Sequence, residues 1–195
     1  KHYRFLYRQL ETSNLRLQTF CCLASCILNL ASSSAQTTFQ KVYKGNYGFT
    51  AILNTLDNGY VSTGYNYQGE SGAGGRDIVL TKFDSLGKVQ WSELIGGKID
   101  ETAYSMREAP DSGFYLTGWS DKNGRSSILV KTDKKGLIEW SRLFGNNYEG
   151  GFGEVTQDTG FIYMSNSTAL GGPRKVNVVK FDKAGNKQWC NLYYI

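Results

Sequence analysis

The chain has 195 residues, 40% of them hydrophobic and 14% aromatic, with 23 glycines and two prolines. This composition predicts a globular, turn-rich protein built from β-strands. The formal net charge is +5, but four basic residues and one acidic residue before residue 20 supply +3 of it, so the rest of the chain lacks the basic patch that nucleic acid binding requires.

The first 35 residues have the organisation of a secretory signal peptide. A basic start precedes an apolar stretch from Phe20 to about Ala31, and small residues follow up to Ala35, after which we predict cleavage. The apolar stretch is shorter than the ~20 residues that a transmembrane helix needs. Two alternatives stay open. One is a lipoprotein signal, because residues 23–26 (LASC) resemble a lipobox that ends at an acylated Cys26, and the other is a structured helix.

A ten-residue phrase that occurs three times organises residues 36–195. It reads KFDSLGKVQW at residues 82–91, KTDKKGLIEW at residues 131–140 and KFDKAGNKQW at residues 180–189, so equivalent positions are 49 residues apart. The phrase repeats an aspartate, a glycine and a tryptophan: Asp84, Gly87, Trp91, Asp133, Gly136, Trp140, Asp182, Gly185 and Trp189. A fixed period of this length is typical of repeat architectures. We place the repeats at residues 42–90, 91–139 and 140–188, with a partial fourth at residues 189–195.

Each phrase predicts a β-hairpin. Its aspartate and glycine occupy the first and last positions of a type I turn, where the carboxylate accepts a backbone N–H and the glycine takes a positive φ. A second turn signal, Asp-x-Gly, precedes each phrase at residues 57–59, 111–113 and 158–160. In the second repeat these signals separate four expected strands, over residues 103–108, 114–119, 128–132 and 137–144. We expect the three tryptophans to pack in the core between neighbouring sheets.

Four antiparallel strands in ~40 to 50 residues match one blade of a β-propeller. We therefore predict an all-β, β-propeller-like array of about three four-stranded antiparallel blades plus the first strand of a fourth. A ring needs ~4 to 8 blades. We expect an open or incomplete ring, and a chain that is a fragment whose open strand edges favour self-association.

The connections after the second strand of each repeat vary in length. In an up-and-down sheet they emerge at the same end as the connections after the fourth strand, and variable loops on a rigid scaffold are where ligands are usually bound. The candidate ligand face at this end comprises Tyr65, Tyr67, Arg76, Lys98, Asp100, Trp119, Asp121, Arg125 and Tyr148. Tyr65 and Trp119 stand at the start of variable loops, where they serve either ligand stacking or the core.

Few residues are suited to catalysis. The only histidine is His2, inside the predicted signal, so the rest of the chain lacks Ser–His–Asp and Cys–His systems and His-ligated metals. Cys190 replaces a serine of the other repeats and is expected to be a small packed side chain, and Glu101 is expected at a solvated strand edge. Residues 121–124 (DKNG) lack the downstream acids of a calcium loop, and residues 69–75 (GESGAGG) lack the lysine and helix of a phosphate loop. We predict no catalytic residue, no cofactor and no metal site.

The full motif string resembles a known group of repeats. It runs from Asp-x-Gly and Thr-Gly-aromatic (residues 63–65, TGY, and 117–119, TGW) through Lys-x-Asp-x-x-Gly-x-x-x-Trp to a Gly-Gly pair. Over residues 42–195 it is similar to the β-propeller repeats of secreted and surface proteins of Bacteroidetes-type bacteria, which implies export, often by the type IX route, and a mostly unassigned function. The chain departs from this pattern at Ser165, where the glycine of the Thr-Gly pair would stand. Residues 84–91 (DSLGKVQW) also resemble, more weakly, the tryptophan-docking segment of quinoprotein-type propellers, in which these residues are structural.

The predicted function is that of an exported, non-catalytic β-propeller repeat module, secreted or at the cell surface, which binds a protein or glycan or has a structural role. An alternative location is the outer membrane, with acylated Cys26 as the membrane contact. The alternative function is that of a propeller enzyme, either a quinoprotein-like oxidoreductase or a carboxylate-dependent glycan-active enzyme.

Overall fold

The computed structural model of the chain describes residue 42 and residues 47–66, 75–122, 124–145, 151–167 and 175–194. All of these residues lie in the second of two compact units, residues 41–195. The described residues form twelve β-strands and no helix. A helix long and apolar enough to cross a membrane is therefore not found among them.

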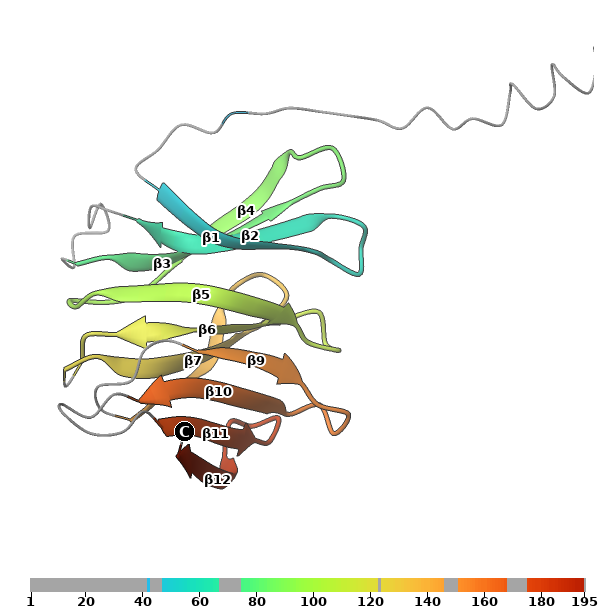
Figure 1. The fold of residues 1–195 in the computed structure, drawn as a ribbon. Helices are drawn as coiled ribbons and strands as arrows, with labels where there is room; N and C mark the ends of the chain where they lie inside the picture. Colours follow the sequence, from blue (N-terminus) through green and yellow to red (C-terminus); the bar gives the residue numbers. More distant parts are fainter. Residues whose placement is uncertain are drawn as a thin grey trace, which may run out of the picture. The chain divides into compact units, whose positions relative to one another are not determined.

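The strands form three four-stranded antiparallel sheets, and strands that are consecutive in sequence are neighbours in each sheet (Figure 1). The first sheet comprises β1 (Tyr47–Asn54), β2 (Tyr60–Asn66), β3 (Asp77–Phe83) and β4 (Val89–Ile95). The second comprises β5 (Glu101–Glu108), β6 (Phe114–Ser120), β7 (Ser126–Thr132) and β8 (Ile138–Phe144). The third comprises β9 (Phe152–Val155), β10 (Phe161–Ser167), β11 (Lys175–Phe181) and β12 (Lys187–Tyr194).

The Asp-x-x-Gly turns join the third and fourth strands of each sheet, as the sequence predicts. In the second sheet the Asp133 carboxylate accepts the N–H groups of Lys135 and Leu137 at 2.8 and 2.9 Å, and Gly136 has a φ of 84°. Glycine adopts this left-handed conformation without the strain that a Cβ brings. In the Asp-x-Gly turns the residue with a positive φ, 63° in each case, is the central one: Asn58, Ser112 and Thr159.

The lysine that opens each phrase is buried, which the sequence analysis does not predict. The Lys131 side chain is 1% exposed, and its Nζ donates to Asp111 Oδ1 at 3.0 Å and to Glu139 Oε2 at 3.1 Å. The equivalent pairs of the other sheets are Lys82 with Asp57 and Lys180 with Asp158. A buried ammonium group requires partners of this kind. The Asp-x-Gly turn thus has a second role, since its carboxylate ties the turn between the first two strands to the third strand.

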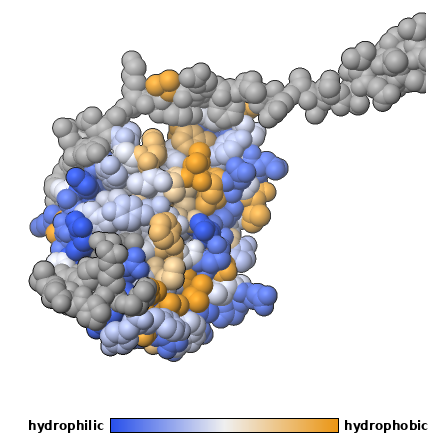
Figure 2. Space-filling view, viewed as in Figure 1, coloured by the Kyte–Doolittle hydropathy of each residue, from blue (hydrophilic) through white to orange (hydrophobic). Residues whose placement is uncertain are grey.

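Two cores lie between the sheets. The core between the first and second sheets is mostly aliphatic and includes Val61, Ile78, Leu80, Leu116 and Val130. The core between the second and third sheets is mostly aromatic and includes Tyr115, Phe161, Tyr163 and Phe181, with Trp140 and Phe144 packed against it. On the face shown in Figure 2, apolar side chains gather in a band that crosses the sheets between hydrophilic side chains. The repeat period predicts this arrangement, in which each sheet buries an apolar face against the neighbouring sheet.

Trp91 and Trp140 pack across these interfaces against the turn glycine of the following sheet. A Cβ added at Gly136 would lie 2.7 Å from Cζ3 of Trp91, and a Cβ added at Gly185 would lie 2.8 Å from Cδ2 of Trp140. The indole N–H of Trp140 also donates to the Lys183 carbonyl at 3.2 Å. The turn therefore requires glycine twice, for its backbone conformation and for the close approach of the indole.

The predicted fold class is confirmed, because the described residues form an all-β array of four-stranded antiparallel, blade-like sheets that do not close into a ring. One detail is wrong: residues 189–195 do not begin a fourth blade. They fall largely on β12, which pairs with β11 and is the last strand of the third sheet. The reason is that each phrase is a hairpin, so its tryptophan lies on the returning strand of the same sheet. The predicted repeat boundaries at residues 91 and 140 accordingly fall within β4 and β8.

Two expectations about β12 are also wrong. Trp189 is 42% exposed instead of packed between sheets, and Cys190 is exposed instead of packed. The Cys190 Sγ lies 3.0 Å from Asn177 Oδ1. Both differences have one cause: β12 is the edge strand of the last described sheet, and all eight of its residues are exposed.

Candidate binding site at the loop end

Three connections of the first two sheets meet at one end of these sheets, called here the loop end: β2–β3 (residues 75–76), β4–β5 (residues 96–100) and β6–β7 (residues 121, 122, 124 and 125). The Glu101 N–H donates to the Arg76 carbonyl at 2.7 Å, and the Arg76 N–H donates to Asp100 Oδ1 at 2.8 Å. The Asp121 N–H donates to the Asp100 carbonyl at 2.9 Å. These bonds confirm that connections after second and fourth strands emerge together, and they place Arg76, Asp100 and Asp121 in one group.

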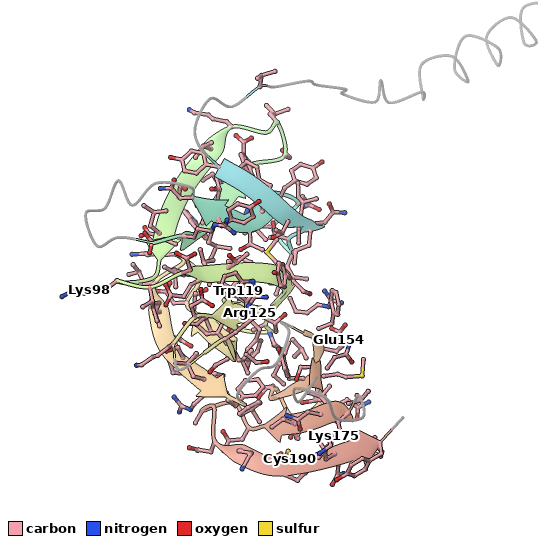
Figure 3. All side chains as sticks on the ribbon, turned by 60° about the vertical axis from the view of Figure 1, so that its left-hand side comes forward. Lys98, Trp119, Arg125, Glu154, Lys175 and Cys190 are labelled. Carbon is pink, nitrogen blue, oxygen red and sulfur yellow. The ribbon has the colours of Figure 1, made fainter. Side chains whose placement is uncertain are left out.

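Trp119 is buried rather than open for stacking. Its side chain is 5% exposed, and its indole N–H donates to the Tyr104 hydroxyl at 2.5 Å. The Arg125 guanidinium lies 4.7 Å from the centre of the indole, and its Nε is 3.9 Å from Asp121 Oδ1. Figure 3 shows Trp119 and Arg125 side by side. A guanidinium over an indole is a favourable cation–π contact, and here it occupies a ring face that a sugar would need.

The other predicted residues of the ligand face divide into three kinds. The Arg76 guanidinium lies 5.4 Å from the centre of the Tyr65 ring, which repeats the pairing of Arg125 with Trp119. Lys98 is exposed and extends from the β4–β5 connection (Figure 3). Tyr67 and Tyr148 lie outside the described residues.

A groove of about 450 Å³ opens beside the loop end, between the first and second sheets. Its walls are aliphatic, formed by Ile95, Ile99, Ile128, Val130, Ile138 and Leu143. Its polar lining consists of Gly96, Gly97, Lys98, Glu101, Ser120, Lys122 and Ser141. A pocket of this size with apolar walls and a few polar groups is the usual form of a ligand site.

Glu101, the first residue of β5, supplies the carboxyl group of the groove. The residue is 8% exposed, and its carboxylate accepts the Gly97 N–H at 3.3 Å and the Ser120 hydroxyl at 3.2 Å. Burial raises the pKa of Glu101, the carboxylates of Asp77 and Asp100 raise it further, and the two hydrogen bonds oppose this rise without cancelling it. The expectation of a solvated glutamate is therefore wrong. Within the described part of the chain, no group of three or more His, Cys, Asp and Glu side chains is placed to hold a metal ion.

The sequence contains a signal for the apolar wall of this groove and none for the burial of Glu101. Strict alternation along β8 places Leu143 on the face opposite Trp140, toward the first sheet, and Leu143 pairs with Ile128 across β7–β8. The apolar wall was therefore open to prediction. The burial of Glu101 depends on Gly97 and Ser120, which only the folded connections bring near it, so its role has no counterpart in the local sequence.

No protein-family model matches the sequence, and no curated protein matches it significantly. The fold is similar to one described as the crystal structure of the eukaryotic initiation factor, with a TM-score of 0.51 and 11% sequence identity. The match covers 83% of this chain and 36% of that chain, so this chain spans little more than a third of the other's length. At this level of identity the likeness concerns the fold alone.

Proposed function

We propose that the protein is an exported, non-catalytic β-propeller-type module that binds a segment of another protein in the groove at the loop end. The observation that carries the proposal is the groove itself, which has six aliphatic side chains in its walls and a hydrogen-bonded carboxyl group at one end. Such a surface suits a peptide that inserts an apolar side chain and offers backbone N–H and C=O groups to the polar lining.

The contacts of Trp119 and Tyr65 favour a protein ligand over a glycan. Sugar-binding platforms need an open aromatic face, but Arg125 lies over Trp119 at 4.7 Å and Arg76 lies over Tyr65 at 5.4 Å. Among the described residues that line the groove, none has an aromatic ring. Ile99, Ile138 and Leu143 instead offer the aliphatic contact that a leucine or isoleucine side chain seeks.

Export is proposed on the sequence alone. It is supported by the signal-like organisation of residues 1–35 and by the resemblance of residues 42–195 to the repeats of secreted and surface proteins of Bacteroidetes-type bacteria. N-terminal sequencing of the mature protein tests this, with cleavage before Gln36 as the expected result. Acylation at Cys26 would move the protein to the outer membrane, and an intact N-terminus would contradict export by either signal.

The binding proposal is tested by selecting peptides from a displayed random library against the wild-type chain, with the Ile138→Glu variant as counter-selection. Ile138 is 52% exposed and lines the groove, so the substitution places a charge on the apolar wall with little cost to folding. The matched control is Leu56→Glu, an equally drastic change at a 75% exposed residue of the β1–β2 turn, outside the groove. Enriched peptides should carry leucine or isoleucine and bind wild type and Leu56→Glu alike. Peptides that bind Ile138→Glu as well as wild type would contradict the proposal.

A second candidate, carboxylate-dependent glycan chemistry, is favoured by one observation. Burial and the neighbouring Asp77 and Asp100 raise the pKa of Glu101, and a carboxyl group with a raised pKa close to other carboxyl groups is the kind of pair that glycosidases use for general acid catalysis. Hydrolysis of a panel of nitrophenyl glycosides by the wild-type chain, lost in Glu101→Gln, would establish this activity. No turnover in either protein would remove it.

A further inference from the structure

The outward face of the third sheet presents the kind of side chains that the other two sheets bury. Three cross-strand pairs share one register: Lys82 with Trp91, Lys131 with Trp140 and Lys180 with Trp189. In the first two pairs the indole packs on the following sheet, whereas Trp189 is 42% exposed. Alternation along β12 places Tyr193 on the same face as Trp189, and Tyr193 is 53% exposed.

Two further residues extend this surface across the sheet. Met164 pairs with Phe152 on β9 and with Val178 on β11, and Phe152 and Met164 are 61% and 50% exposed. The open face is defined here as Phe152, Met164, Trp189 and Tyr193. The opposite face of the same sheet belongs to the core with the second sheet. Among the described strands, none lies beyond β12 in Figure 1, and several large apolar side chains exposed on one face of a sheet mark an interaction site.

The two interfaces inside the chain show what such a face recognises. In each, the tryptophan rests on a turn glycine of the next sheet, where a Cβ would lie 2.7 or 2.8 Å from an indole carbon. In the second interface Arg142, two residues after the tryptophan, donates from Nε to the Gly185 carbonyl at 2.8 Å. In the first, the ring of Trp91 also lies 6.1 Å from that of Phe114, which follows the Asp-x-Gly turn. The recognised feature is a four-stranded sheet with a left-handed glycine between its third and fourth strands.

A second copy of the chain does not offer an equivalent receiving face. Trp189 would have to dock on the outer face of its first sheet, because the second and third turn glycines are already covered by Trp91 and Trp140. On that outer face Ser62 stands where the receiving sheets inside the chain have Leu116 and Tyr163. Phe49 and Ile52, which are 49% and 68% exposed, line an open groove there.

We propose that the open face is the docking surface for a further four-stranded unit of this repeat, joined in series after the third sheet and recognised by its turn glycine. The geometry continues the two interfaces that the chain already contains. Trp189 takes the place of Trp140, and the incoming glycine takes the place of Gly185. Docking buries the four residues of the open face and turns β12 from the last strand of the array into one side of an interface.

The test joins a second copy of residues 96–144, which carry the second sheet, to the end of the full chain. The expected result is a monomer whose melting temperature exceeds that of the chain alone by about 5 °C, with slower amide hydrogen exchange in β12. The matched control carries Gly136→Val in the appended copy only, which places side-chain atoms where Trp189 should rest and removes the gain. In the chain alone Trp189→Ala leaves the melting temperature nearly unchanged, and in the fusion it abolishes the increase.

Several outcomes would overturn the proposal. One is a Trp189→Ala variant with the same effect in both backgrounds, and another is a Gly136→Val fusion that behaves like the unmodified fusion. An appended unit that stays unfolded beside the open face also contradicts it, because the same sequence folds as the second sheet of the chain. Finally, if sedimentation velocity shows that the chain alone is a dimer, and Trp189→Ala dissociates it, the face is covered by its own copy instead.

Discussion

The two interfaces between neighbouring sheets have the same backbone arrangement but differ in the size of the side chains that pack between the sheets. Near the loop end of the second interface, Phe144 packs edge-on against Tyr163 with 4.7 Å between ring centres. The equivalent residues of the first interface, at the same distance from the repeat tryptophan and from the Asp-x-Gly turn, are Ile95 and Leu116. Ile95 lines the groove. The comparison teaches that side-chain volume at a few positions, and not the backbone, decides whether an interface of this type leaves a groove.

The largest expected effect comes from removing the aromatic filling of the second interface. Tyr163 is fully buried, and its hydroxyl accepts the Gly151 N–H at 2.7 Å. Tyr163→Ala should lower the free energy of unfolding by about 4 kcal/mol, because it leaves a cavity and an unpaired N–H. Chemical denaturation measures this loss. The control, Tyr163→Phe, removes only the hydrogen bond and should cost about 1 kcal/mol; equal costs for the two variants would contradict the packing argument.

The next effect distinguishes the covered tryptophan of the second interface from the open one of the third sheet. Trp140→Ala should cost about 3 kcal/mol, since its indole contacts Gly185 and packs against the core that contains Tyr115. Trp189→Ala should cost less than about 1 kcal/mol, because the side chain is 42% exposed at the edge of the array. Denaturation curves of the two variants give both values. Similar costs would show that Trp189 is covered in solution.

Acid should weaken the ion pairs that hold the Asp-x-Gly turns of the outer sheets. A hydrogen bond from Thr55, followed by one from Lys82, lowers the pKa of Asp57 from 3.8 to about 2, and Lys180 chiefly lowers that of Asp158 to about 2. Both folded values lie below the unfolded value, so this stabilisation is fully present above about pH 4 and is lost as the pH falls toward about 2. Melting temperatures measured across this range should fall. The fall should be shallower in the Asp57→Asn, Asp158→Asn double variant, and parallel curves would contradict the assignment.

The strands of the second sheet could be predicted from the sequence to within two residues. The expected ranges 103–108, 114–119, 128–132 and 137–144 compare with Glu101–Glu108, Phe114–Ser120, Ser126–Thr132 and Ile138–Phe144 in the structure. The reason is local: turn residues end each strand, and the period-two alternation identifies the faces. The assignment of residues 189–195 to a new blade failed because a repeat period does not reveal its own starting point.

The buried charges were not predictable in the same way. The sequence around Lys131 does not distinguish a buried lysine from a solvated one. Its partner Asp111 lies 20 residues away, so only the fold brings the two side chains together. Glu101 is buried by bonds from Gly97 and Ser120, which belong to different connections. The sequence also did not decide whether Trp119 packs in the core or stacks on a ligand, because its contacts with Tyr104 and Arg125 arise only in the folded sheet.

The smallest expected change in stability bears most directly on the comparison of the two interfaces. Ile95→Phe gives the first interface the side chain that the second has at this position, and the added ring extends toward the groove. Because the groove offers it open space, the free energy of unfolding should change by less than about 1 kcal/mol. The peptides selected against the wild-type chain should no longer bind, as isothermal titration would show, whereas Ile95→Val should still bind them. If Ile95→Phe retained full affinity, the peptides would bind elsewhere, and the difference in volume between the two interfaces would have no part in function.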